Sequence, residues 1–243
     1  MPADTVRHLQ VLRLRSGDEL TVFDGRGGEW EARLLSTAGP VRAEILCHVA
    51  IERELPWAVT LAVAMPANDR MDWLMEKATE MGAAAIQPLM SARSVLRLEG
   101  ERAARRVAHW QAAVVAACEQ CGRNRVPEVR PVLSLANWFS TLPAFNDPDV
   151  RGEARCLLAA PREGGATSFA AWAGPHKARL QATAVAAGAI LVLSGPEGGL
   201  DPEEAARARA AGFAAVSLGP RVLRAETAPL AFLAALGGLA LQE

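Results

Sequence analysis

The chain has 243 residues, of which 51% are hydrophobic and 22% are charged, and its formal net charge at pH 7 is −1. That length suits one large domain or two modest ones, with enough apolar residues for a real core. The near-zero net charge argues against a protein that attracts nucleic acid through bulk positive charge. No apolar run reaches the length of a membrane span and no secretory signal begins the chain, so we expect a cytoplasmic protein.

Residues 1–53 are expected to form a small β domain. Three partly alternating apolar runs are separated by glycine-rich turns, a pattern typical of short strands joined by hairpins. These runs cover 20–23, 29–35 and 41–46. The pattern favours a small barrel.

From residue 54 to residue 243, apolar strand-like runs alternate with helical patterns. The predicted strands cover 59–64, 84–89 and 155–160, and the predicted helices cover 69–81, 101–122 and part of 131–142. Because strands that alternate with helices pair in parallel, we expect an α/β domain with a mainly parallel sheet over 54–243.

The C-terminal part contains a strand, a Gly-Pro loop and a helix start twice in succession. The apolar run 189–193 ends in Ser194-Gly195-Pro196-Glu197-Gly198-Gly199, and the run 215–218 ends in Gly219-Pro220-Arg221-Val222-Leu223-Arg224. Ligands bind at the carboxyl ends of strands in α/β sheets, and glycine allows the backbone to approach a ligand closely. The pair of loops predicts a ligand site, although each alone is compatible with an ordinary turn.

The ligand expected at these loops has no phosphates. Neither a G-x-G-x-x-G motif nor a P-loop is present, and the prolines remove N–H donors that a phosphate would need. A ligand held by backbone contacts and apolar walls fits better. S-adenosylmethionine is such a ligand.

Three segments together resemble one known family. They are ACEQCGRNRVPE at 117–128, LSGPEGG at 193–199 and LGPRVLRAETA at 218–228. They are similar to the signatures of the ribosomal small-subunit (16S) RNA uracil-N3 methyltransferases of the SPOUT superfamily. The resemblance implies methylation of a specific uridine at N3 with S-adenosylmethionine as cofactor. It also implies a trefoil-knotted methyltransferase domain and a PUA-like RNA-binding domain over residues 1–53.

The predicted cofactor site consists of the two loops and the end of the strand at 155–160. Its residues are Leu158, Gly195, Pro196, Glu197, Gly198, Gly199, Leu218, Gly219, Leu223 and Thr227.

Arg224 and Glu226 are the predicted catalytic residues. Methylation at N3 requires loss of a weakly acidic ring proton, and a carboxylate is a weak base for this unless it is buried. Arg224 is suited to stabilise the negative charge that develops on the uracil carbonyl oxygens. The alternative for Glu226 is an ion pair with Arg224 or Arg221 that braces the loop, so the identity of the base stays open.

RNA contacts are expected from polar residues at the end of the helix 101–122 and from arginines elsewhere. Amide and guanidinium groups at a helix end suit contacts to phosphates and bases, although arginines there also cap helix carbonyls. Since the net charge is near zero, we expect the assembled small subunit (30S) to be preferred over bare RNA. The predicted RNA-binding residues are His8, Arg13, Gln120, Arg123, Asn124, Arg125 and Arg221.

Two further patterns concern assembly and metal binding. Residues 227–241 are apolar nearly all round, which predicts a helix buried on several sides and a homodimer that pairs through it.

Cys118 and Cys121 lie at a helix end with no second cysteine pair, which favours packing over a redox or metal role. We therefore expect no metal.

Two other functions remain compatible with the sequence. One is another SPOUT reaction, such as ribose 2′-O-methylation. The other is a noncatalytic RNA-binding protein that assists ribosome assembly. Cofactor binding separates the enzymes from the assembly factor, and nucleoside analysis of the product separates the two methylations.

Overall fold

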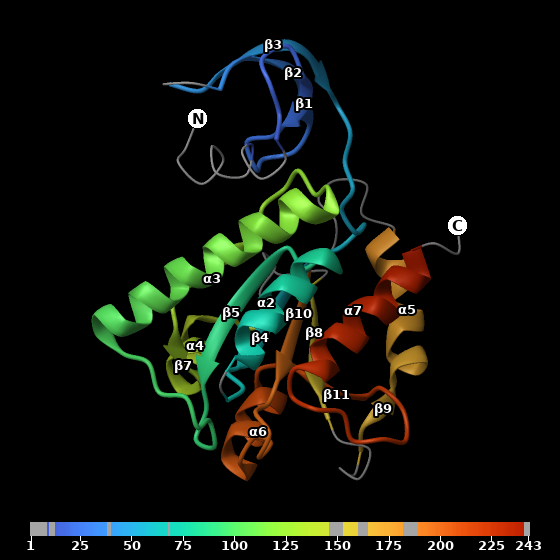
Figure 1. Cartoon of the computed structure of the whole chain (residues 1–243). Helices are drawn as coiled ribbons and strands as arrows, with labels where there is room; N and C mark the ends of the chain where they lie inside the picture. The colour runs from blue at the N-terminus through green and yellow to red at the C-terminus, as the bar shows by residue number, and fades with distance from the viewer. Residues whose placement is uncertain are drawn as a thin grey trace. The chain divides into compact units, whose positions relative to one another are not determined.

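The computed structural model describes residues 9, 13–37, 40–67, 69–145, 153–159, 165–181 and 189–240 (Figure 1). The contacts divide the chain into two compact units. The first consists of Met1–Arg53 with Gly122–Val126, and the second consists of Glu54–Cys121 with Pro127–Glu243.

The first unit contains a three-stranded antiparallel sheet in its described part, in the order β1-β2-β3. Its strands lie where the alternating apolar runs predict them. Leu34 is fully buried and forms a small core with Leu9 and Val41. The strands are β1 (Glu19–Val22), β2 (Glu29–Ser36) and β3 (Arg42–Val49).

The segment Gly122–Val126 joins this first unit although it follows a helix of the second. The backbone N–H of Gly27 donates to the carbonyl of Asn124 at 3.1 Å, and that of Val126 donates to Gly25 at 3.0 Å. Arg125 forms an ion pair with Glu52 at 2.8 Å, which lowers the pKa of the Glu52 carboxyl. The segment is thus held by backbone and side-chain contacts together.

Within its described residues, the second unit is built on an eight-stranded sheet in which every strand pair is parallel. The strand order is β6-β5-β4-β10-β8-β11-β9, and β7 pairs with β5. The predicted α/β class with a mainly parallel sheet is confirmed. The strands are β4 (Ala58–Ala64), β5 (Ala85–Met90), β6 (Glu128–Val129), β7 (Leu133–Ser134), β8 (Ala154–Leu158), β9 (Thr167–Ser168), β10 (Ala189–Ser194) and β11 (Ala214–Ser217).

Helices cover both faces of this sheet. On one face α2 contacts α3 and α7, and α7 contacts β10; elsewhere α4 packs against α6 (Figure 1). The helices are α2 (Arg70–Glu80), α3 (Gly100–Cys121), α4 (Leu135–Thr141), α5 (Phe169–Gln181), α6 (Pro202–Ala210) and α7 (Thr227–Ala240). No helix in these described ranges is both long and apolar enough to cross a bilayer.

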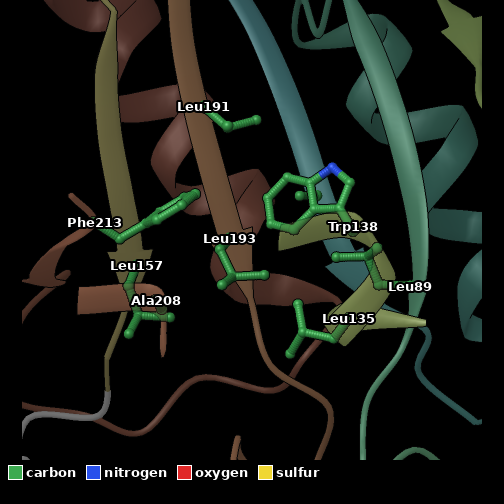
Figure 2. Close-up of a cluster of buried hydrophobic side chains, with 9 residues drawn as sticks. Leu89, Leu135, Trp138, Leu157, Leu191, Leu193, Ala208 and Phe213 are labelled. Atoms are coloured by element: carbon green, nitrogen blue, oxygen red, sulfur yellow. The ribbon is translucent and has the colours of Figure 1, made fainter. Parts of the chain in front are cut away.

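One buried cluster shows how the strand that precedes the first Gly-Pro loop is held in place. Side chains of a strand alternate between the faces of a sheet, so Leu191 and Leu193 of β10 point to one side. There they pack with Trp138 of α4 and Ala208 of α6 (Figure 2). Burial of such side chains contributes about 1.5–3 kcal/mol each, which anchors β10 firmly.

Helix α5 and strand β9 lie where the sequence predicts no element. Gly174 and Pro175 interrupt the helical pattern of α5, and both residues disfavour a helix interior. Tertiary contacts compensate. Phe169 packs edge-on against Phe232 of α7, with ring centroids 5.4 Å apart, and Trp172 contacts the same ring.

Candidate active site

The two Gly-Pro loops follow β10 and β11, at the carboxyl ends of strands in the parallel sheet. Strand β8 lies between β10 and β11, so the loops belong to strands that do not pair with one another. The helix after the first loop begins with a capping box. Asp201 accepts from the Glu204 backbone, Glu204 accepts from the Asp201 backbone, and Pro202 occupies the first turn. This cap fixes where the loop ends.

A cavity of about 770 Å³ lies between the loops and the end of β8. Its volume is within the range of roughly 300–1,000 Å³ that is usual for small-molecule sites. Most of the predicted site residues line it together. They are Leu158, Gly195, Pro196, Glu197, Gly198, Gly199, Leu218, Arg221, Leu223 and Arg224.

The first loop is held from two sides by arginines outside it. The Glu197 carboxylate accepts hydrogen bonds from the Ala67 backbone N–H at 3.1 Å and from Arg70 Nη1 at 2.8 Å. On the other side, Arg93 Nη1 donates to the carbonyl of Gly198 at 2.7 Å. Both arginines also line the cavity. The loop backbone is therefore positioned before any ligand binds.

Glycine is favoured within the loops for two different reasons. A Cβ on Gly195 would stand 3.2 Å from the backbone nitrogen of Leu200, because the loop folds back tightly on itself. Gly219 has a φ of 121°, a conformation that L side chains rarely adopt. Gly219 and Thr227 are predicted cofactor-binding residues that are not part of the cavity lining, and their role stays a prediction.

Glu226 is buried beside the cavity, with 9% of its side chain exposed. Its Oε1 lies 3.8 Å from Nε of Arg70. Its Oε2 is buried and has no hydrogen-bond partner among the described residues. A buried carboxylate oxygen without a donor is costly, so this atom is suited to accept from a bound ligand.

Arg224 and Arg221 stand in the second loop with exposed side chains. In the described part of the chain Arg224 makes no ion pair, and the cationic neighbour of Glu226 is Arg70. The carbonyl of Arg224 accepts from the backbone N–H groups of Thr227 and Ala228, at 2.9 and 3.0 Å, which starts α7. Its guanidinium remains available at the cavity wall.

The residues predicted to bind RNA fall into three groups. His8 lies outside the described residues. Arg13, Gln120, Arg125 and Arg221 are exposed. Arg123 and Asn124 are buried, with 4% and 1% exposed, and Asn124 Nδ2 donates to the carbonyl of Ile51 at 2.6 Å. For these two residues, burial favours support of the segment over direct contact with RNA.

Arg70 and Arg93 are site residues that the sequence analysis missed. Arg70 opens α2 shortly after β4, and Arg93 follows β5, so each comes after the carboxyl end of a parallel strand. The rule that ligands bind at these strand ends applies to both positions. Applying it to every predicted strand, rather than to the two with Gly-Pro loops, would have included them.

The sequence matches two known families that together account for most of the chain. Residues 53–237 match the RNA methyltransferase domain, and residues 2–46 match the RNA methyltransferase PUA domain. The chain is also similar to a crystal structure of ribosomal RNA small subunit methyltransferase E from Neisseria gonorrhoeae bound to S-adenosyl methionine. The two are 37% identical, with a TM-score of 0.81 over 98% of this chain and 90% of that one. The fold and the loops thus define an RNA methyltransferase with a PUA domain.

Relatives in other bacteria narrow the class. Ribosomal RNA small subunit methyltransferase E of Bacillus subtilis is 30% identical over 96% of this chain and 87% of its own length. The corresponding protein of Synechocystis is 36% identical over 95% of this chain and 69% of its own length. The chain therefore belongs to the ribosomal RNA small subunit methyltransferase E family, as its motifs predict. The trefoil knot stays a prediction.

Proposed function

We propose that this chain transfers a methyl group from S-adenosylmethionine to N3 of a specific uridine in small-subunit ribosomal RNA. The observation that carries the proposal is the cavity between the two Gly-Pro loops. It lies in a chain 37% identical to a relative whose structure holds S-adenosyl methionine. The choice of N3 as the atom that accepts the methyl group rests on the resemblance of the motifs in 117–128 and 218–228 to those of the uracil-N3 methyltransferases.

The residues present fit this cofactor. The tight turn at Gly195 leaves the first loop without a side chain where the backbone meets the cavity. Leu157, Leu158 and Leu218 supply apolar wall. When bound, the cofactor supplies an electrophilic methyl group on a sulfonium.

Arg224 is the residue that stabilises the negative charge on the reacting uracil. Loss of the N3 proton places negative charge on the uracil ring and its two flanking carbonyl oxygens. A guanidinium at the cavity wall stabilises that charge, and the backbone of Arg224 is held because its carbonyl accepts the first hydrogen bonds of α7. Glu226 is the candidate acceptor for the proton, since its buried Oε2 is free to accept one.

The same proposal covers the partners of the protein. The RNA substrate is ribosomal RNA within the 30S subunit, contacted by the exposed residues Arg13, Gln120, Arg125 and Arg221. A protein that modifies ribosomal subunits is expected to act in the cytoplasm. The active form is a homodimer that pairs through α7.

One experiment tests the reaction directly. The protein is incubated with labelled S-adenosylmethionine and immature small subunits, and the RNA is digested and analysed by mass spectrometry. We expect labelled 3-methyluridine. Label in a 2′-O-methylated nucleoside would contradict the N3 assignment, and an absence of label with confirmed RNA binding would favour an assembly factor.

A further inference from the structure

Arg70 lies between one carboxylate from each of the two Gly-Pro loops. Its Nη1 donates to Oε1 of Glu197 in the first loop at 2.8 Å, and its Nε lies 3.8 Å from Oε1 of Glu226 in the second. Arg70 belongs to neither loop, because it opens α2. A single guanidinium with several donors in a rigid fork can serve two carboxylates at once.

This position matters because the sheet does not fix the loops to one another. The loops follow β10 and β11, and β8 separates those strands. Arg70 opens the helix that follows β4, and β4 pairs directly with β10, the strand that leads into the first loop. From there the Arg70 guanidinium reaches the acidic residue at the far end of the second loop.

Burial makes the contact to Glu226 consequential. Glu226 is 9% exposed and Glu197 is 33% exposed, whereas Arg70 is 41% exposed. Removal of a cation from a buried carboxylate leaves a charge without compensation, which is more costly than the loss of an exposed pair. Loss of Arg70 therefore destabilises the present position of the Glu226 carboxylate, whereas α7 keeps its own packing in the core.

We propose that Arg70 is a positioning residue that ties the two Gly-Pro loops together through Glu197 and Glu226, so that both walls of the cavity are set before a ligand enters. The identity of the ligand, S-adenosylmethionine, rests on the proposed function. The tie itself rests on the contacts of Arg70. A tie broken at either end is fully broken, so the effects of breaking both ends do not multiply.

Arg93 provides a matched comparison. It also is an arginine at the cavity wall, and it also holds the first loop, through the carbonyl of Gly198 at 2.7 Å. Among the described residues, its hydrogen bond to the loops reaches the first loop and not the second. Replacement of Arg93 removes one hold on that loop but leaves Glu197 and Glu226 tied.

The test is a cycle of variants measured by calorimetry with S-adenosylmethionine. Glu197→Gln and Glu226→Gln are made singly and together, in the wild-type chain and in Arg70→Met. We expect each single change to weaken the affinity for the cofactor about fivefold or more. The affinity of the double variant should lie within about twofold of that of the single variant that binds more weakly. In the Arg70→Met background, where cofactor binding is already weakened, neither glutamate change should lower the affinity further by more than about twofold. In Arg93→Met the glutamates should remain coupled as in wild type.

Effects of the two glutamate changes that multiply in the wild-type chain would overturn the proposal. So would coupling that persists without Arg70, or coupling that disappears in Arg93→Met.

Urea unfolding checks that each variant is folded, and Glu226→Asp is used if Glu226→Gln does not fold. Because a positioned cavity acts on binding, Arg70→Met should raise the KM for the cofactor by a larger factor than it lowers kcat. A merely structural loss would lower kcat and leave Kd unchanged. Failure of the wild-type chain to bind the cofactor would instead contradict the proposed function.

Discussion

At the scale of single residues, Gly219 tests whether the backbone conformation of the second loop is needed for cofactor binding. It has a φ of 121° and follows β11 at the start of the second loop. We expect Gly219→Val to abolish detectable binding of S-adenosylmethionine in calorimetry, because a branched side chain strains this conformation and displaces the loop.

The control for this change is Gly174→Ala. Gly174 lies in α5, and a Cβ built there meets nothing within 4 Å. Its affinity for the cofactor should equal that of the wild type. Unchanged affinity in a folded Gly219→Val variant would move the site away from this loop.

Arg224 is expected to act in the chemical step more than in cofactor binding. Removal of one preorganised group that stabilises charge costs on the order of a hundredfold or more in rate. Arg224→Ala should therefore keep its affinity for the cofactor within a few-fold and lose about a hundredfold in turnover at saturating substrate.

The contrast with Glu226 tests the alternative role of Arg224. If Arg224 only braced the loop through Glu226, Arg224→Ala and Glu226→Gln would weaken cofactor binding in parallel. The structure pairs Glu226 with Arg70 instead, at 3.8 Å. Calorimetry on both variants should thus show weakened binding for Glu226→Gln alone. Near-normal turnover in Arg224→Ala would remove this residue from the mechanism.

At the scale of elements, α7 is apolar nearly all round but buries only part of its surface inside its own unit. Its large side chains Leu230, Phe232, Leu233 and Leu236 are buried inside the unit, whereas Ala234 and Gly238 are exposed. A face of small residues allows another helix to approach closely. The part of α7 that remains for a subunit interface is therefore this small-residue face.

We expect the wild-type protein to sediment as a dimer and Ala234→Arg to sediment as a monomer of about 26 kDa. A buried arginine without a partner at such an interface is strongly unfavourable. The matched control is Ala206→Arg on the exposed side of α6, which should stay dimeric. A wild-type monomer at micromolar concentration would exclude the dimer.

Strand β8 is fixed by an arginine whose side chain is 1% exposed. Arg155 pairs with Glu153 at 2.6 Å and donates to the carbonyls of Ala211 and Pro143, at 2.7 and 3.0 Å. Arg155→Met leaves all three acceptors without this donor, so we expect a loss of about 3 kcal/mol in unfolding free energy by urea denaturation. A loss below 1 kcal/mol would show that the acceptors find water.

At the scale of the whole molecule, charge predicts the physical state of the substrate. With a net charge of −1, the chain has little general attraction for phosphates. Assembled small subunits should therefore be methylated faster than protein-free ribosomal RNA, by initial rates at equal RNA concentration. Equal rates on both substrates would contradict this expectation.

The sequence alone predicted much of this molecule because its signals are local. Apolar runs such as 189–193 predicted the strands, and Gly-Pro dipeptides predicted where strands end. Because loops at the ends of parallel strands gather at one edge of a sheet, these signals also predicted that the two Gly-Pro loops lie beside one another at a cavity. Residues within one short segment determine each of these features.

Other features depend on residues far apart in the chain, and only the tertiary structure decided them. Arg70 and Glu197 are 127 residues apart, and no local pattern marks them as partners. Helix α5 forms despite Gly174 and Pro175 because Phe169 packs on Phe232. The segment Gly122–Val126 belongs to the first unit through hydrogen bonds to Gly25 and Gly27. The sequence by itself thus determined the longer strands, the Gly-Pro loops and the family, whereas the contacts that hold the loops in place arise only when distant segments pack together.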